Sequence, residues 1–125
     1  MSNNENRVPI ENFKKNLDEV FKILNKHKIK DIIFIGLTPV ADELLNPMPW
    51  KPTHGYSNEN VQKYDAVLKQ TAQENNSTYI ELYEKFMNSD NYKKLLSDGL
   101  HPNTEGHELV YNLILSKLNL LSLLD

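Results

Sequence analysis

Ile32-Ile33-Phe34-Ile35-Gly36-Leu37 is the longest apolar run of this chain and the stretch that decides its fold. The run is rich in β-branched and aromatic residues and does not alternate with polar ones. Such a pattern is typical of a strand covered on both faces, as in a parallel sheet between layers of helices. We therefore expect a strand at about residues 31–37 in an α/β fold.

A helical pattern precedes this strand. Pro9 suits the first turn of a helix, and apolar residues then recur at three- and four-residue steps. The helix should end near His27, where lysines are favoured by the helix dipole. Its apolar stripe consists of Ile10, Phe13, Leu17, Val20, Phe21 and Leu24.

A second helix and a second strand follow. Ser57 or Asn58 can cap a helix that runs to about Asn75, and residues 78–82 then read as a strand. A strand, a helix and a strand in this order form one βαβ unit, which should be parallel and right-handed. A last helix, capped near residues 103–104, should carry an apolar stripe of Leu109, Val110, Leu113, Ile114 and Leu118.

Composition limits the class of protein. The 125 residues are 39% hydrophobic and 25% charged, which predicts one globular domain over residues 1–125, with residues 1–8 poorly ordered. A net charge of −3 gives no basic surface for nucleic acid. The chain has no cysteine and no apolar run long enough to span a membrane, so we expect no membrane partner. The cytoplasm is the default location, unless a secretion signal has been lost from the N-terminus.

The strongest chemical signal is Asp98-Gly99-Leu100-His101-Pro102-Asn103, directly before the last helix. A carboxylate three residues before an imidazole can accept a hydrogen bond from one ring nitrogen, which leaves the other nitrogen as a free base. The alternative is that a pair of this kind serves only to cap the start of a helix. The longer string is more specific than the pair.

That string resembles the C-terminal signature of the SGNH, or GDSL-type, esterases and acylhydrolases. The turn Gly36-Leu37-Thr38-Pro39-Val40 after the first strand is also similar to a turn of this family. The resemblance implies that Asp98 is the orienting acid and His101 the general base of a Ser-His-Asp triad. It also implies a partial flavodoxin-like α/β/α fold, in which the two strands are the fourth and fifth and the N-terminal strands are missing.

The family's nucleophile is not found in this sequence. The Gly-Asp-Ser turn that presents its serine and the Gly-x-Asn-Asp turn that supplies oxyanion donors are both absent. Ser57, Ser77 and Ser97 read as cap, turn and loop residues rather than replacements. We therefore expect negligible ester hydrolysis by this chain alone. The alternative is a non-catalytic dimeric or partner-binding module derived from a truncated hydrolase.

Substrate contacts are expected from the first strand's exit and the long connection after it. Residues 40–56 contain several prolines and should be irregular, and long loops of this kind often line a crevice. Candidate substrate-binding residues are Thr38, Pro39, Trp50 and His54, although Trp50 could instead pin the loop over the core. His54, His101 and His107 show no metal-ligand spacing, so no metal and no cofactor is expected.

The expected sheet has an unpaired edge. Two strands rarely form a stable sheet alone, and an exposed edge invites another strand to pair with it. We expect either a homodimer through Ile32–Leu37 or a complementing N-terminal chain at that edge. If such a half completes the site, the substrate is a small ester.

Overall fold

The computed structural model describes residues 6–124, and residues 1–5, part of the segment predicted to be poorly ordered, lie outside that range. Its elements in chain order are the helix α1 (Ile10–Lys26), the strand β1 (Ile33–Ile35), the short helix α2 (Asp42–Leu45), α3 (Asn58–Glu74), β2 (Thr78–Ile80), α4 (Tyr83–Met87), the 3-10 helix η1 (Tyr92–Leu95) and α5 (Thr104–Leu120).

The two strands pair in parallel, with Phe34 opposite Tyr79. The predicted parallel sheet is thus confirmed, but each strand is shorter than the sequence suggested. One hydrogen bond beyond each end of β1 extends the pairing, from the Thr78 N–H to the Ile32 carbonyl and from the Gly36 N–H to the Ile80 carbonyl. The chain leaves the sheet at Leu37, whose N–H donates to an Asp65 carboxylate oxygen at 2.9 Å instead.

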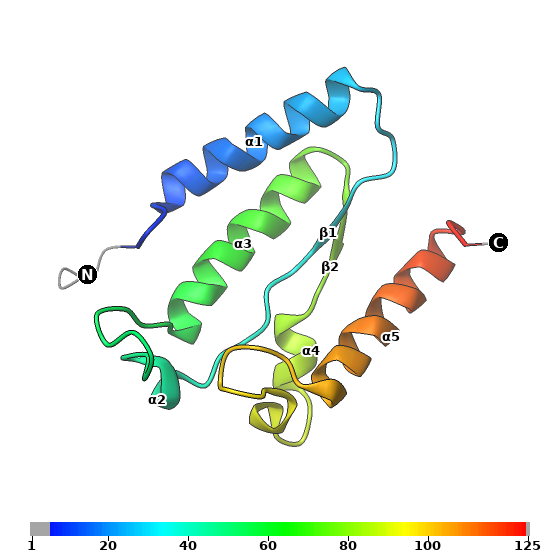
Figure 1. The fold of residues 1–125 in the computed structure, drawn as a ribbon. Helices are drawn as coiled ribbons and strands as arrows, with labels where there is room; N and C mark the ends of the chain where they lie inside the picture. The colour runs from blue at the N-terminus through cyan, green and yellow to red at the C-terminus, as the bar shows by residue number, and fades with distance from the viewer. Residues whose placement is uncertain (1–5, 125) are drawn as a thin grey trace.

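The sheet separates two layers of helices. Figure 1 shows α1 and α3 side by side on one side of the strands and α5 on the other side. The rings of Phe21 on α1 and Phe34 on β1 lie 4.9 Å apart, so α1 covers this face of the sheet directly. The arrangement is the predicted α/β/α sandwich with two strands in place of a full sheet.

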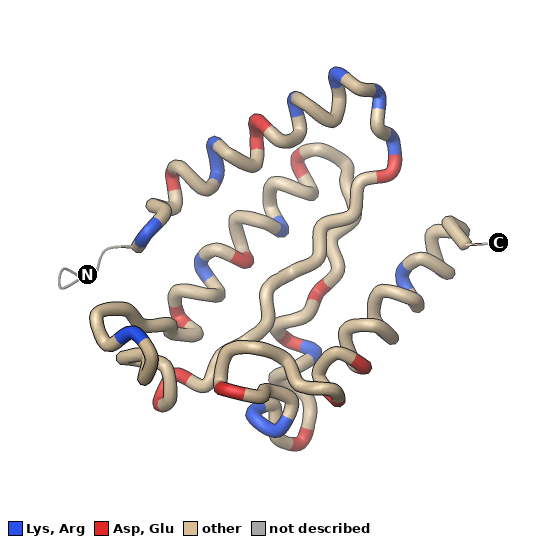
Figure 2. The backbone as a smooth tube through the Cα atoms, viewed as in Figure 1, with Lys and Arg blue, Asp and Glu red and all other residues tan. Residues whose placement is uncertain are grey.

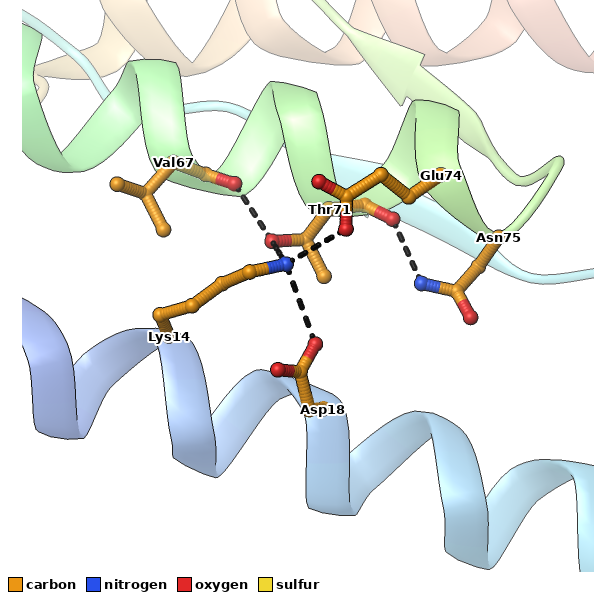
Figure 3. A network of polar contacts seen from close by, with 6 residues as sticks. All are labelled: Lys14, Asp18, Val67, Thr71, Glu74 and Asn75. Carbon is orange, nitrogen blue, oxygen red and sulfur yellow. Dashed lines mark hydrogen bonds and ion pairs between the residues drawn. The ribbon is translucent and has the colours of Figure 1, made fainter.

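A polar network joins α1 to α3 (Figure 3). The Lys14 ammonium group on α1 donates to Glu74 at 2.8 Å and to the Thr71 hydroxyl at 3.1 Å, both on α3. It also pairs with Asp18, one turn further along α1, at 3.2 Å. The Thr71 hydroxyl donates to the Val67 carbonyl, so the lysine meets an oxygen that α3 already holds in place.

The opposite face is less completely covered. Side chains alternate between the faces of a strand, so Ile35 and its partner Ile80 lie on the face opposite Phe34. Ile80 is 3% exposed, whereas Ile35 is 45% exposed. On α5, only Gly106 is buried, and Leu120 is 80% exposed. The layer on the α5 side therefore covers β2 and leaves β1 open.

Two sequence expectations are corrected by this structure. Residues 40–56 are not entirely irregular, because α2 forms a helical turn immediately after the buried pair Val40 and Ala41. Val20 is 42% exposed and does not belong to the buried stripe of α1, since Phe21 beside it makes the contact with the sheet. No helix between residues 6 and 124 has the length and apolar character needed to cross a membrane.

Candidate active site

The loop that carries Asp98 and His101 is closed by its own backbone. Leu96 and Pro102 form an isolated antiparallel bridge, and the Ser97 N–H donates to the His101 carbonyl at 2.8 Å. The Ser97 hydroxyl donates to the same carbonyl at 3.1 Å. Directly after the loop, the Asn103 side chain caps α5 by accepting from the Gly106 N–H at 3.0 Å. The loop is thus fixed at both ends.

Asp98 and His101 form a direct pair. One Asp98 oxygen lies 2.6 Å from His101 Nδ1, and the other accepts from the N–H groups of Leu100 and His101 at 2.9 and 2.7 Å. The His101 backbone bond, followed by its side-chain bond, lowers the pKa of Asp98 to about 2. At neutral pH the carboxylate therefore holds a hydrogen on Nδ1, which leaves Nε2 as the basic nitrogen.

The His101 imidazole is open to solvent. Its side chain is 67% exposed, and that of Asp98 is 38% exposed. No hydrogen bond joins Nε2 to any residue in the described part of the chain. A group arriving from solvent can therefore reach this nitrogen, so the pair has the geometry of a general base with its orienting acid.

Gly99 sets the position of this loop on the fold. Its φ of +87° is in the left-handed region that favours glycine, and a side chain there would press on Ala41 and Leu44. The Ala41 N–H donates to the Gly99 carbonyl at 2.9 Å. Leu100 packs on the core cluster that includes Val40. The acid–base pair is consequently docked against the turn that follows β1.

Asn58 holds that turn in place, a role that sequence reasoning missed. Its side chain accepts from the Val40 N–H at 2.8 Å and donates to the Val40 carbonyl at 2.8 Å. The Tyr92 hydroxyl donates to the same carbonyl at 3.1 Å. The sequence indicated Asn58 only as a possible helix cap, because its partner lies eighteen residues away along the chain.

Asp65 is a second residue that the sequence did not single out. The residue is 8% exposed, and its carboxylate accepts from the Tyr79 hydroxyl at 2.7 Å, besides the bond from Leu37. Burial, together with the bond to Asp65, raises the pKa of the Tyr79 hydroxyl well above its usual value. A carboxylate between apolar residues on the covered face of α3 was the available signal. Asp65 fixes the point at which the chain leaves β1.

The predicted substrate-binding residues are placed differently from one another. His54 lines a cavity at the end of β1, whereas Trp50 is 53% exposed and is not part of its lining. Pro39 is fully buried, and Thr38 is half-buried in the turn that Asn58 holds. Trp50 therefore does not pin its loop over the core, and the substrate contacts themselves stay predictions. No three His, Asp or Glu side chains within residues 6–124 gather into a possible metal site.

The fold and the site together define a class: an α/β sandwich with a hydrogen-bonded aspartate–histidine pair at the end of a parallel sheet. A sequence model of the GDSL-like lipase/acylhydrolase family matches residues 3–109, and the chain belongs to this family. The resemblance noted from the sequence is thereby confirmed. No curated protein is a significant match.

Solved structures show the same fold over part of their length. A lipase/acylhydrolase from Enterococcus faecalis has a TM-score of 0.72 at 19% identity, covering 94% of this chain and 54% of its own. A GDSL-like lipase from Bacteroides thetaiotaomicron has a TM-score of 0.70 at 19% identity, covering 88% and 52%. An acetylxylan esterase from Geobacillus stearothermophilus has a TM-score of 0.66 at 20% identity, covering 87% and 47%. The chain thus spans about half the length of these proteins.

Proposed function

We propose that this chain supplies the acid and base of an acyl-ester hydrolase whose serine comes from the N-terminal half of the fold. The observation that carries this proposal is the 2.6 Å pair of Asp98 and His101 with the imidazole open to solvent. In the proposed reaction, His101 Nε2 removes the proton of a serine hydroxyl as the serine attacks the ester carbonyl. The imidazolium then gives the proton to the leaving alcohol, which leaves an acyl-serine, and Asp98 stabilises the charge of the imidazolium. In the second half of the reaction Nε2 takes a proton from water as the water attacks the acyl-serine, and gives it to the serine oxygen as the carboxylic acid departs.

The nucleophile must come from outside the residues described. The sequence has no Gly-Asp-Ser turn and no Gly-x-Asn-Asp turn. Ser97, the serine nearest in sequence to His101, donates its hydroxyl to the His101 carbonyl and lies in the same closed loop. Removing the nucleophile from a triad enzyme costs about six orders of magnitude in rate. We therefore expect the chain alone to be essentially inactive.

The unpaired edge of β1 is the proposed docking surface for the missing half. Bonds to β2 use the Ile32 carbonyl and the Gly36 N–H. Since bonding directions alternate along a strand, the N–H and C=O groups of Ile33 and Ile35 point to the other edge. Ile35 is also the exposed residue on the α5 face. A strand added at this edge would satisfy these groups, and a helix beside α5 would cover Ile35.

The proposal is tested by p-nitrophenyl acetate hydrolysis, with this chain alone and together with the polypeptide encoded directly upstream. We expect a buffer-level rate alone and turnover with the upstream half, lost on the order of 10⁴-fold or more in His101→Ala. His107→Ala, a histidine on the first turn of α5, is the matched control and should keep the rate. Amide exchange at Ile33 and Ile35 should slow when the half docks.

Two results would count against this function. Turnover by the chain alone that is blocked by a serine-reactive phosphonate would show that no second half is needed. Absence of turnover in both samples would favour the alternative, a non-catalytic module that uses the same edge to bind a second copy of itself. Light scattering then distinguishes a dimer from a monomer at micromolar concentration.

A further inference from the structure

A cavity of about 1070 Å³ opens at the end of β1, between the segment that leads into α1 and the connection between α2 and α3. Its lining includes the apolar side chains of Phe13, Leu37, Met48 and Val61. A space of this size with apolar and polar lining has the usual character of a small-molecule site.

Backbone hydrogen bonds build the wall formed by the α2–α3 connection. The Met48 N–H donates to the His54 carbonyl, and the His54 N–H donates to the Lys51 carbonyl, both at 2.9 Å. The Tyr56 N–H donates to the Leu45 carbonyl at 3.0 Å. Lys51 and His54 therefore occupy defined positions on this wall.

The opposite wall is tied to α3. The Asn60 side chain donates to the Asn6 side chain at 2.7 Å, and the Tyr64 hydroxyl donates to the Val8 carbonyl. Arg7 lies between these two anchored residues and lines the cavity. The cavity thus has a cationic residue on each of its two walls.

The charge of the cavity is positive. Neither Arg7 nor Lys51 has an ion pair with any carboxylate that the structure describes, whereas Lys63, a third cation of the lining, pairs with Glu59 at 3.4 Å. Figure 2 shows basic positions both on the segment before α1 and on the α2–α3 connection. Desolvation, followed by the charges of Lys51 and Arg7, lowers the pKa of His54. The lowered pKa favours the neutral form of the His54 imidazole.

The cavity is coupled to the acid–base loop through shared core contacts. Met48 lines the cavity and belongs to a buried cluster with Val40 and Leu45. Leu100, the residue before His101, packs on that same cluster. The cavity and the His101 loop therefore both border one small core at the same end of the sheet.

We propose that this cavity binds a carboxylate on an apolar stem, with Arg7 and Lys51 as its cationic contacts and Phe13, Leu37 and Val61 beside the stem. A ligand of this kind that also contains an ester would place an anionic group apart from the reacting carbonyl. The chain would then select esters with a second, anionic end. That selection rests on the function proposed above, whereas the binding of the carboxylate does not.

The test is an NMR titration of the ¹⁵N-labelled chain with benzoate and with benzamide, its uncharged analogue of nearly equal shape. We expect benzoate to shift the signals of His54 and Lys51 and to bind about tenfold more tightly than benzamide at low salt. Lys51→Gln and Arg7→Gln should each weaken benzoate binding about 3- to 10-fold and leave benzamide unchanged. Lys85→Gln, on α4, is the matched control, and circular dichroism verifies that each variant is folded.

Equal binding of the two probes, or benzoate binding that neither variant weakens, would overturn the inference. Charge-dependent binding without any hydrolysis in the completed protein would leave the carboxylate site standing and refute the proposed reaction. Conversely, His101-dependent hydrolysis with no benzoate site would support the reaction and refute the selection of anionic esters.

Discussion

The two helical layers of this protein differ in how they meet the sheet. The α1–α3 layer is held by the ring contact of Phe21 with Phe34 and by the polar network of Lys14. Within residues 6–124, α5 makes no ring contact or polar network of this kind with the sheet, although its Leu109 and Val110 pack on a buried cluster that includes Phe86. Its terminal leucines are exposed, Leu120 to 80%. The helices themselves have equal length, 17 residues each for α1, α3 and α5.

This difference indicates which face of the sheet is fully covered by helices within this chain. Polar pairing between α1 and α3 gives these helices a defined relative position. The apolar side chains of α5 are spread around the helix rather than confined to one stripe, as expected of a helix covered on several sides, yet Tyr111 is 62% exposed and Leu120 is 80% exposed. The α5 side is therefore where a further layer would add most buried apolar area.

The largest expected contrast comes from one truncation in each layer. Phe21→Ala, at a side chain that is 2% exposed, should lower the free energy of unfolding by about 3–5 kcal/mol. Leu120→Ala should change it by less than about 0.5 kcal/mol. Urea unfolding followed by circular dichroism measures both. A cost above about 2 kcal/mol for Leu120→Ala would show that α5 is already covered in solution.

Asp65→Asn should have the next largest effect, on the α3 side of the sheet. The substitution weakens the bonds from Tyr79 and Leu37 to a buried carboxylate, and we expect a loss of about 1–3 kcal/mol in unfolding free energy. Asp18→Asn, at an exposed carboxylate on α1, is the control and should cost less than about 1 kcal/mol. Equal costs would mean that Asp65 does not hold the exit of β1.

Lys14→Met tests the polar network between α1 and α3, with an expected loss of about 0.5–1 kcal/mol. The bond to Glu74 is the main cause that raises the pKa of Lys14. Its stabilising effect is therefore complete below the unfolded-state pKa of about 10.4 and is lost as the pH rises through the higher folded-state pKa. Urea unfolding at pH 7 and pH 11.5 should show a difference between variant and parent that shrinks at the higher pH.

Asp98→Asn should have the smallest effect on stability, less than about 1 kcal/mol after solvent screening, because the pair is exposed. The lowered pKa of Asp98 stabilises the fold above the unfolded-state value of about 3.9. This contribution disappears as the pH falls through about 2. The difference between variant and parent should accordingly be present at pH 5 and be mostly lost by pH 2.

The same variant should change the tautomer of His101. Without a carboxylate to accept a hydrogen from Nδ1, the preference for a basic Nε2 is removed. Nitrogen chemical shifts of the imidazole report this directly, with His107 as the internal reference. An unchanged tautomer would show that the 2.6 Å pair does not orient the ring.

The parts of the fold that could be predicted are those that depend on local sequence. The three long helices follow from apolar periodicity, and the contacts of Asp98 with His101 span three residues. The bonds from Val40 to Asn58 and from Tyr79 to Asp65 join segments that are distant in sequence, so no local pattern reveals which residues are partners. The short helix α2 was missed because the prolines that follow it indicated an irregular segment.

The lengths of both strands were overestimated from the sequence for a related reason. Residues with high β-propensity extend pairing only where a neighbouring strand accepts it, and β1 has such a neighbour on one side within the described chain. Because β1 pairs with a strand on only one side in the described chain, Ile35 stays exposed although it belongs to an apolar run of six residues. Sequence pattern alone reports the burial that a complete sheet would give.

The self-closed loop from Ser97 to Asn103 has a consequence for the order of events. Its backbone bridge, glycine turn and carboxylate bonds fix the imidazole when this chain folds. The conformational entropy of assembling acid and base is therefore lost before any nucleophile arrives. In the proposed reaction the N-terminal half would bring the serine hydroxyl and the oxyanion donors to a base that is already in place, so complementation should behave as a bimolecular docking step followed by chemistry, with a rate that saturates as the concentration of that half rises.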